Sequence, residues 1–166
     1  MDADLLEELY RKYHRSALLY CTALCGDPHL AQDIAAEAFI KAYLRLPDDI
    51  PSFRYWLLRV CKNLWYDHLR KESQRSITEL PPILTDGITP ENTYIQKEQL
   101  KYLWRAIGTL SPMDRELLTL YYFSEVPLQE AARLLGKTYP AVRQRMTRLR
   151  QTLKQEMEEQ GYGRDV

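Results

Sequence analysis

A run of aromatic, amide and basic side chains lies on one predicted helix, residues 53–71, with the sequence FRYWLLRVCKNLWYDHLRK. At about 100° per residue, one face of this helix carries polar, aromatic and cationic side chains: Arg59, Lys62, Asn63, Tyr66 and Arg70. The opposite face carries apolar side chains: Leu57, Val60, Cys61 and Leu64. Aromatic rings stack on unpaired bases, at about 1–3 kcal/mol per base, and cations bind the phosphates. The first face, with the adjoining Lys71, therefore predicts a surface for opened nucleic acid. The alternative is an amphipathic helix with core rings and solvated charges.

A second candidate surface is the segment 137–154, which contains six basic residues and no acidic residue: Lys137, Arg143, Arg145, Arg148, Arg150 and Lys154. A short predicted helix, residues 128–135, precedes it, and Gly136 and Lys137 form the turn between them. Thr138 is expected to cap the basic helix, with Pro140 in its first turn. Two apolar stripes then face each other: Leu128, Ala131, Ala132 and Leu135 on the first helix, and Val142, Met146, Leu149 and Leu153 on the second. This pattern predicts a helix-turn-helix over residues 128–154.

The outer face of the basic helix carries donors and acceptors suited to a DNA major groove. The side chains expected nearest the base edges are Arg143, Gln144, Thr147 and Arg148, with Gln151 on the same face. Those expected to bind the phosphates include Lys137, Arg145 and Arg150. We predict that this helix binds duplex DNA, against the alternative of an ordinary solvated face.

A third candidate surface is acidic and lies on the second predicted helix. Asp33, Glu37 and Lys41 share one face at four-residue spacing. The same helix carries more apolar residues than one buried stripe requires: Ile34, Phe39, Ile40, Tyr43 and Leu44. The acidic pair and the surplus apolar surface predict a basic protein partner; the alternative is that a three-helix core takes up most of these residues.

Sequence motifs for catalysis, metal binding and cofactor binding are absent: no Gly-rich phosphate loop, no HExxH and no nucleophile elbow occur. We therefore expect a non-enzyme without a cofactor. The three cysteines, Cys21, Cys25 and Cys61, form no disulfide pattern. A metal or redox site at Cys21 and Cys25, near His14 and His29, is an alternative to simple burial of these thiols.

The chain of 166 residues has a formal net charge of zero, but its charges are segregated. Acidic residues predominate over positions 1–53, opposite in sign to the basic segment at the other end. No apolar run approaches the roughly 20 residues of a membrane span, and the acidic N-terminus does not resemble a secretory signal. We expect no membrane insertion and a cytoplasmic location.

Helical periodicity dominates the whole chain, so the predicted fold class is all-α. Three helices are expected in the first unit, over residues 3–24, 28–46 and 53–75, with breaks at Gly26-Asp27-Pro28 and Pro47–Pro51. Residues 73–89 lose the period and contain Pro81, Pro82 and Gly87, as expected of a flexible linker. Further helices are expected over residues 91–108 and from a cap at Ser111 to about residue 123.

These motifs resemble those of the extracytoplasmic-function (ECF) group of bacterial sigma factors, the smallest members of the sigma-70 family. The segment DIAAEAFIKAY keeps the family's acidic polymerase-binding pattern at Asp33, Glu37, Phe39, Lys41 and Ala42, with departures at Ala36 and Ala38. The next helix matches at Phe53, Trp56, Leu57, Asn63, Asp67, Arg70 and Lys71. Residues 110–153 resemble the family's fourth region, although Tyr139-Pro140 and Leu149 depart from its usual residues.

The resemblance implies two small helical domains and a sequence of roles along the chain. Residues 1–75 would form a region 2-like domain, 76–92 the linker, and 93–160 a region 4-like domain. Asp33, Glu37, Phe39 and Lys41 would contact core RNA polymerase, at the clamp helices of its largest subunit. The helix from residue 53 would recognise and hold the downstream (−10) promoter element as it opens, and the basic helix would recognise the upstream (−35) element. An anti-sigma factor is a further partner that the family implies.

A competing hypothesis is a helix-turn-helix regulator that never joins polymerase and uses its first domain for sensing or dimerisation. It predicts tight duplex binding by the free protein. The sigma factor hypothesis predicts weak promoter binding until core polymerase is present.

Overall fold

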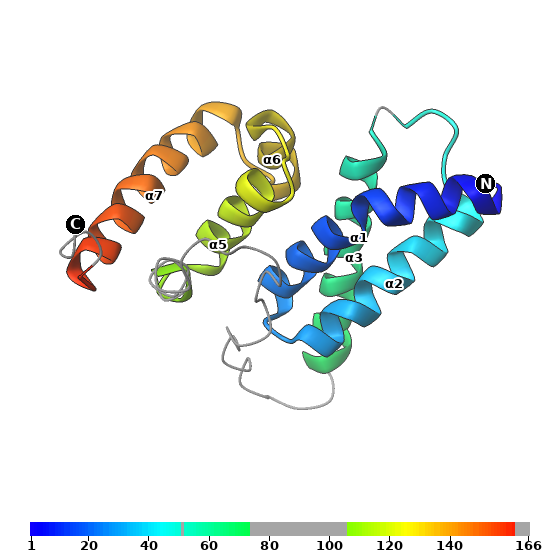
Figure 1. Cartoon of the computed structure of the whole chain (residues 1–166), viewed down its shortest axis with the longest axis horizontal. Coiled ribbons are helices and arrows are strands. Elements are labelled where there is room, and N and C mark those ends of the chain that lie inside the picture. The colour runs from blue at the N-terminus through cyan, green and yellow to red at the C-terminus, as the bar shows by residue number, and fades with distance from the viewer. Residues whose placement is uncertain (51, 74–105, 162–166) are drawn as a thin grey trace.

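The computed structural model describes residues 1–50, 52–73 and 106–161, and all regular secondary structure in these ranges is helical (Figure 1). The predicted all-α fold class is confirmed. The predicted linker, residues 76–92, and most of the helix expected over residues 91–108 lie outside the described residues.

Three long helices form the first unit: α1 (Ala3–Cys25), α2 (Pro28–Arg45) and α3 (Phe53–Ser73). Their ends follow local chemistry that the sequence shows. The Asp2 carboxylate accepts a hydrogen bond from the Leu5 N–H, and Gly26 ends α1 with a φ of 71°, which glycine adopts without strain. Asp27 then caps α2, which has Pro28 in its first position.

The second unit contains α5 (Pro112–Leu118), α6 (Leu128–Leu135) and α7 (Tyr139–Glu159). Ser111 caps α5 and Thr138 caps α7, as predicted. The sequence predicted one continuous helix to about residue 123, but the chain changes to a π-helical turn, η2 (Thr119–Phe123), after Leu118. The extra residue per turn shifts the direction of the side chains that follow.

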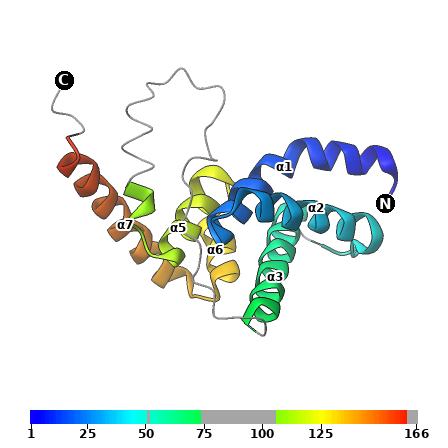
Figure 2. The same cartoon turned by 90° about the horizontal axis from the view of Figure 1, so that it is seen from below.

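The two units pack against each other along α1, which contacts α2 and α3 in its own unit and α5 and η2 in the other. Figures 1 and 2 show the two groups of helices side by side, with the first turn of α1 and the last turn of α7 at opposite ends of the molecule. Buried apolar side chains from both units form one contiguous cluster. The sequence predicted two domains and a linker, but it did not predict this packing.

All three cysteines are buried and free, so the described structure contains no disulfide among them. A hydrogen bond with the Cys61 thiol, together with burial, raises the pKa of Cys21 far above its usual range. Burial also raises the pKa of Cys25 to about 11. The reactive thiolate is therefore scarce at neutral pH.

We expect the native protein to react slowly with an aromatic disulfide reagent at pH 8, because all three thiols are buried and the pKa values of Cys21 and Cys25 are raised. The same protein in denaturant should react rapidly at all three positions, Cys21, Cys25 and Cys61. Absorbance of the released thiolate measures both rates. Rapid reaction of even one cysteine in the native protein would contradict the burial described above.

Candidate nucleic-acid interface

The outer face of α3 presents most of the side chains that the sequence assigned to opened DNA. Arg59, Asn63, Tyr66 and Arg70 are exposed, as is Lys71 in the last turn. Arg70 forms an ion pair with Asp67 on the same face. Since exposed ion pairs are weak, about 0–1 kcal/mol, the guanidinium can exchange this partner for a phosphate. The face thus offers one ring and three cations to a single strand.

Lys62 is an exception. The prediction that its ammonium group is exposed on the DNA-binding face of α3 is wrong for the packed arrangement of the two units. The residue is only 8% exposed. Its Nζ donates to Glu116 Oε1 at 2.8 Å and to the backbone oxygen of Leu134 at 2.6 Å. Leu134 lies in the last turn of α6, where unpaired carbonyls attract cations. Lys62 stands at the edge of the predicted face, within reach of these acceptors on the second unit.

Glu116 is the centre of this contact between the two units. The residue is 8% exposed, and its carboxylate accepts a second hydrogen bond, from the hydroxyl of fully buried Tyr20, at 2.7 Å. Burial raises the pKa of Tyr20 well above its usual value, and the neighbouring Glu116 charge raises it further. The phenol therefore remains a donor to the carboxylate. Side chains from α1, α3 and α5 thus meet at one buried charge pair.

Two weaker polar contacts lie beside this cluster. The Ser124 hydroxyl donates to the backbone oxygen of Ser16 at 3.3 Å. Arg54, at the start of α3, lies 3.9 Å from Glu130 of α6. Both contacts cross between the units, the first from the end of η2 to α1 and the second from α3 to α6, so they support the same relative placement of the two units.

Helices α6 and α7 form the predicted helix-turn-helix. Gly136 adopts a φ of 66° in the turn, which favours glycine. The predicted inner stripe of α7 is buried: Val142, Met146, Leu149 and Leu153. The predicted outer residues are exposed, except that Arg145 is partly buried: Lys137, Thr138, Arg143, Gln144, Thr147, Arg148 and Gln151.

Arg145 and Arg150 have intramolecular partners that the sequence did not predict. Arg145 Nε donates to Asp114 at 2.5 Å, which joins α7 to α5. Arg150 donates to the Tyr122 hydroxyl at 2.9 Å and lies over the rings of Tyr121 and Tyr122. The bond from Arg150 to Tyr122 raises the pKa of the guanidinium, so it remains charged. These two arginines thus join α7 to α5 and η2, near the predicted DNA surface.

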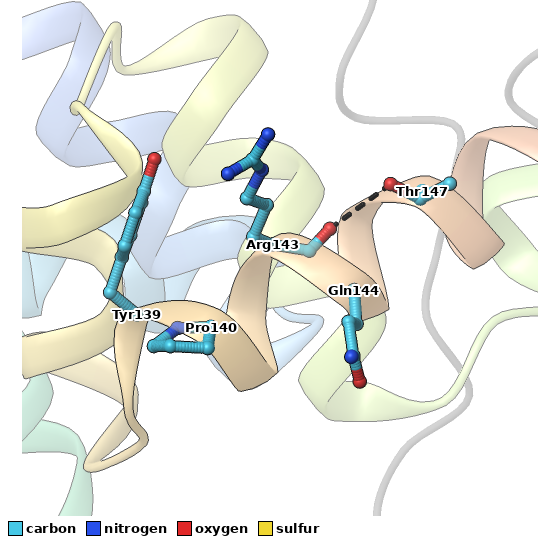
Figure 3. A pocket seen from close by; sticks show the side chains of 5 residues that line it. All are labelled: Tyr139, Pro140, Arg143, Gln144 and Thr147. Carbon is cyan, nitrogen blue, oxygen red and sulfur yellow. Dashed lines mark hydrogen bonds between the residues drawn. The ribbon is translucent and has the colours of Figure 1, made fainter.

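The first three turns of α7 border a shallow hollow of about 320 Å³ (Figure 3). Five residues line it: Tyr139, Pro140, Arg143, Gln144 and Thr147. Three of these, Arg143, Gln144 and Thr147, are residues that the sequence placed nearest the base edges. Tyr139 was not among the predicted DNA-binding residues. An aromatic residue at the first position of a basic helix is the sequence feature that could have drawn attention to it.

The acidic surface of α2 is exposed at Asp33, Glu37 and Lys41. Phe39 is buried, at 5% exposure, and its ring packs against Tyr10 with centroids 5.0 Å apart. The prediction that Phe39 itself contacts polymerase is therefore corrected: it positions α2 from within the core. The surplus apolar surface is present, since Ile40 and Leu44 are 58% and 67% exposed and Tyr43 is also exposed.

Two kinds of site are absent from the described residues. No group of three or more His, Cys, Asp or Glu side chains within residues 1–50, 52–73 and 106–161 is arranged to hold a metal ion. None of the helices in those ranges combines the length and the hydropathy that a membrane crossing requires.

Comparison with known proteins finds two family models that match separate parts of the chain. Residues 9–75 match the model of sigma-70 region 2, and residues 100–153 match the model of sigma-70 region 4. The chain is 28% identical to the ECF RNA polymerase sigma factor SigW of Bacillus subtilis, covering 94% of this chain and 90% of SigW. It is 26% identical to SigM of the same organism, covering 90% and 93%.

Among solved structures, the fold is similar to the sigma factor RpoE of Bartonella quintana, determined in complex with the anti-sigma factor NepR. The TM-score is 0.65 at 19% identity, covering 92% of this chain and 98% of that one. CnrH, determined with the cytosolic domain of CnrY, gives a TM-score of 0.65 at 20% identity, covering 95% and 90%. With regions 2 and 4 both matched and relatives similar along almost their full length, the chain belongs to the ECF group of the sigma-70 family of RNA polymerase sigma factors.

Proposed function

We propose that this sigma factor binds core RNA polymerase through α2 and directs it to promoters that α3 and α7 recognise at two separate elements. The observation that carries the proposal is the pair of exposed basic faces on two helical units, one suited to single strands and the other to a duplex groove. The protein acts as a binding factor, not as a catalyst, in the cytoplasm where the bacterial polymerase acts.

The polymerase contact combines charge with apolar surface on α2. Asp33 and Glu37 supply two exposed carboxylates, suited to a basic surface such as that of the clamp helices. Ile40, Tyr43 and Leu44 add the apolar area that a stable protein interface needs at its centre. Phe39 supports this surface from the core.

The upstream promoter element is read by α7 in the major groove. Arginine and glutamine side chains form paired hydrogen bonds with guanine and adenine edges respectively, which gives discrimination of about 1–3 kcal/mol for each good pair. Arg143, Gln144 and Arg148 are exposed and suitably placed on the outer face. Lys137, at the turn, can bind a backbone phosphate.

The downstream element is held as a separated strand on α3. Tyr66 can stack on a base, and Arg59, Asn63, Arg70 and Lys71 can bind the adjoining backbone. These contacts favour unpaired bases over a duplex, whose rings are already stacked. Differential binding then offsets the free energy needed to unstack a few base pairs.

Lys62 joins this DNA surface only when the two units separate. In the described arrangement its Nζ is 2.8 Å from Glu116 Oε1 and is shielded from solvent. A phosphate must displace that carboxylate, which belongs to the other unit. Promoter binding that engages Lys62 therefore favours the separated arrangement. We propose that core polymerase also binds the separated units more tightly than the packed ones, so the free chain binds promoters weakly.

An anti-sigma factor is a further proposed partner. Of the two proteins of similar fold, RpoE was determined with the anti-sigma factor NepR, and CnrH was determined with the cytosolic domain of CnrY. A partner that stabilises the packed arrangement of this chain would keep Lys62 buried. It would thus oppose initiation without covering every DNA-binding residue.

Run-off transcription over a promoter library, with bacterial core polymerase and this protein, tests the proposed function. We expect protein-dependent transcripts from a restricted set of promoters. Asp33→Arg should reduce these transcripts about tenfold or more, because it places a cation against the basic polymerase surface. A higher concentration of the variant should restore transcription. Arg70→Ala should reduce open-complex formation without changing polymerase affinity.

Asp49→Arg provides a matched control, because this charge reversal lies in an exposed loop outside α2. It should transcribe like the unmodified protein. If no promoter yields a protein-dependent transcript while the free protein binds duplex tightly, the chain is a regulator that does not join polymerase.

Replacing Glu116 with Gln tests whether the buried charge pair holds the units together. The substitution leaves the Lys62 ammonium buried without its counter-charge, a change that costs about 3–5 kcal/mol when it is not relieved. Separation of the units relieves it by hydrating Lys62. We therefore expect a larger radius of gyration by small-angle X-ray scattering of the free protein.

Glu7→Gln is the control for Glu116→Gln. It makes the same chemical change, but the ion pair that it removes, with Arg11, is exposed. Exposed pairs contribute only about 0–1 kcal/mol, so no expansion is expected. If Glu116→Gln lowers the melting temperature but leaves the scattering curve unchanged, the pair stabilises a fixed assembly of the two units.

A further inference from the structure

Tyr139 is the one exposed large apolar side chain on α7, a helix that lies wholly within the described residues. It is 40% exposed at the first position of the helix, directly after the Thr138 cap. Its hydroxyl has no hydrogen-bond partner among the residues that the structure describes. The exposed part of the ring is therefore available for contact with another molecule.

The ring of Tyr139 forms one wall of the hollow on the outer face of α7. Figure 3 shows the ring and the Arg143 side chain, one turn later, extending in the same direction, with Pro140 at the base. Gln144 extends the other way and Thr147 follows one turn beyond Arg143. Ring carbons and the proline ring thus border hydrogen-bond donors.

This combination fits the major-groove edge of a thymine. Thymine presents a 5-methyl group and the O4 acceptor there, and no other standard DNA base carries the methyl group. Apolar side chains recognise it by contact, while arginine or glutamine can donate to neighbouring acceptors. Residues in the first turns of a recognition helix are those that reach base edges.

We propose that Tyr139 is a specificity-determining residue whose ring packs against the 5-methyl group of one thymine in the upstream promoter element. The inference rests on the proposed function, because it requires α7 to enter the major groove. The ring would provide an apolar contact that selects a base by shape, in addition to the polar contacts of Arg143 and Gln144.

Deoxyuridine substitution tests this contact, because it removes the methyl group and leaves base pairing intact. Each thymine of the upstream element, on either strand, is replaced singly in a promoter that the polymerase bound to this protein transcribes. We expect one replacement to weaken promoter binding about fourfold, the effect of exposing one buried methyl group. Tyr139→Ala should bind the thymine and deoxyuridine promoters equally, because it has no ring for the methyl group to contact.

Tyr139→Phe is the matched variant, since it keeps the ring and removes only the hydroxyl. It should retain the fourfold preference for thymine. The proposal is overturned if no deoxyuridine position separates the unmodified protein from Tyr139→Ala, or if the upstream element contains no thymine. It is also overturned if Tyr139→Phe loses the preference, because the hydroxyl would then make the contact.

These outcomes are distinct from a failure of the proposed function. If the unmodified protein yields no promoter-specific transcript with core polymerase, the sigma factor role fails first and the thymine contact fails with it. If transcription is specific but insensitive to every methyl group, only the role of Tyr139 fails.

Discussion

The arrangement of the two units depends on one buried carboxylate, that of Glu116. A charge removed from water must be compensated by an opposite charge and by hydrogen bonds, or the fold loses several kcal/mol. Lys62 supplies the charge at 2.8 Å and Tyr20 supplies a hydroxyl at 2.7 Å. Since these partners come from α3 and α1, the compensation is complete only when the second unit lies against the first. The apolar cluster that spans both units has the same requirement.

This constraint connects the fold to the proposed function. A lysine on a helix that holds DNA can pair with a phosphate or with Glu116, and one ammonium group cannot remain fully buried while it binds a strand. Buried ion pairs contribute little net stability, because desolvation cancels much of the attraction. The packed arrangement therefore buries Lys62 but is only weakly stabilised by the ion pair. Binding to polymerase and promoter can then compete with the packing of the two units.

The sequence predicted the features that depend on nearby residues. Helix ends at Asp27, Ser111 and Thr138 follow from side-chain caps, and the buried stripe of α7 follows from its period. It did not predict the burial of Lys62, because periodicity gives the face of a residue but not the neighbour that meets it. Tyr20 and Glu116 are 96 positions apart, and no local pattern pairs them. For the same reason, Arg145 was predicted to bind DNA and Phe39 to bind polymerase, although Arg145 pairs with Asp114 and Phe39 is buried.

The most direct test of this account is the reactivity of the Lys62 amino group toward an acylating reagent, measured by mass spectrometry. Lys71, exposed on the same helix, is the internal reference. In the free protein Lys62 should react much more slowly than Lys71, and binding to core polymerase should raise its rate. If Lys62 reacts as rapidly as Lys71 in the free protein, or stays protected in the polymerase complex without DNA, the central role of the Glu116 pair is contradicted.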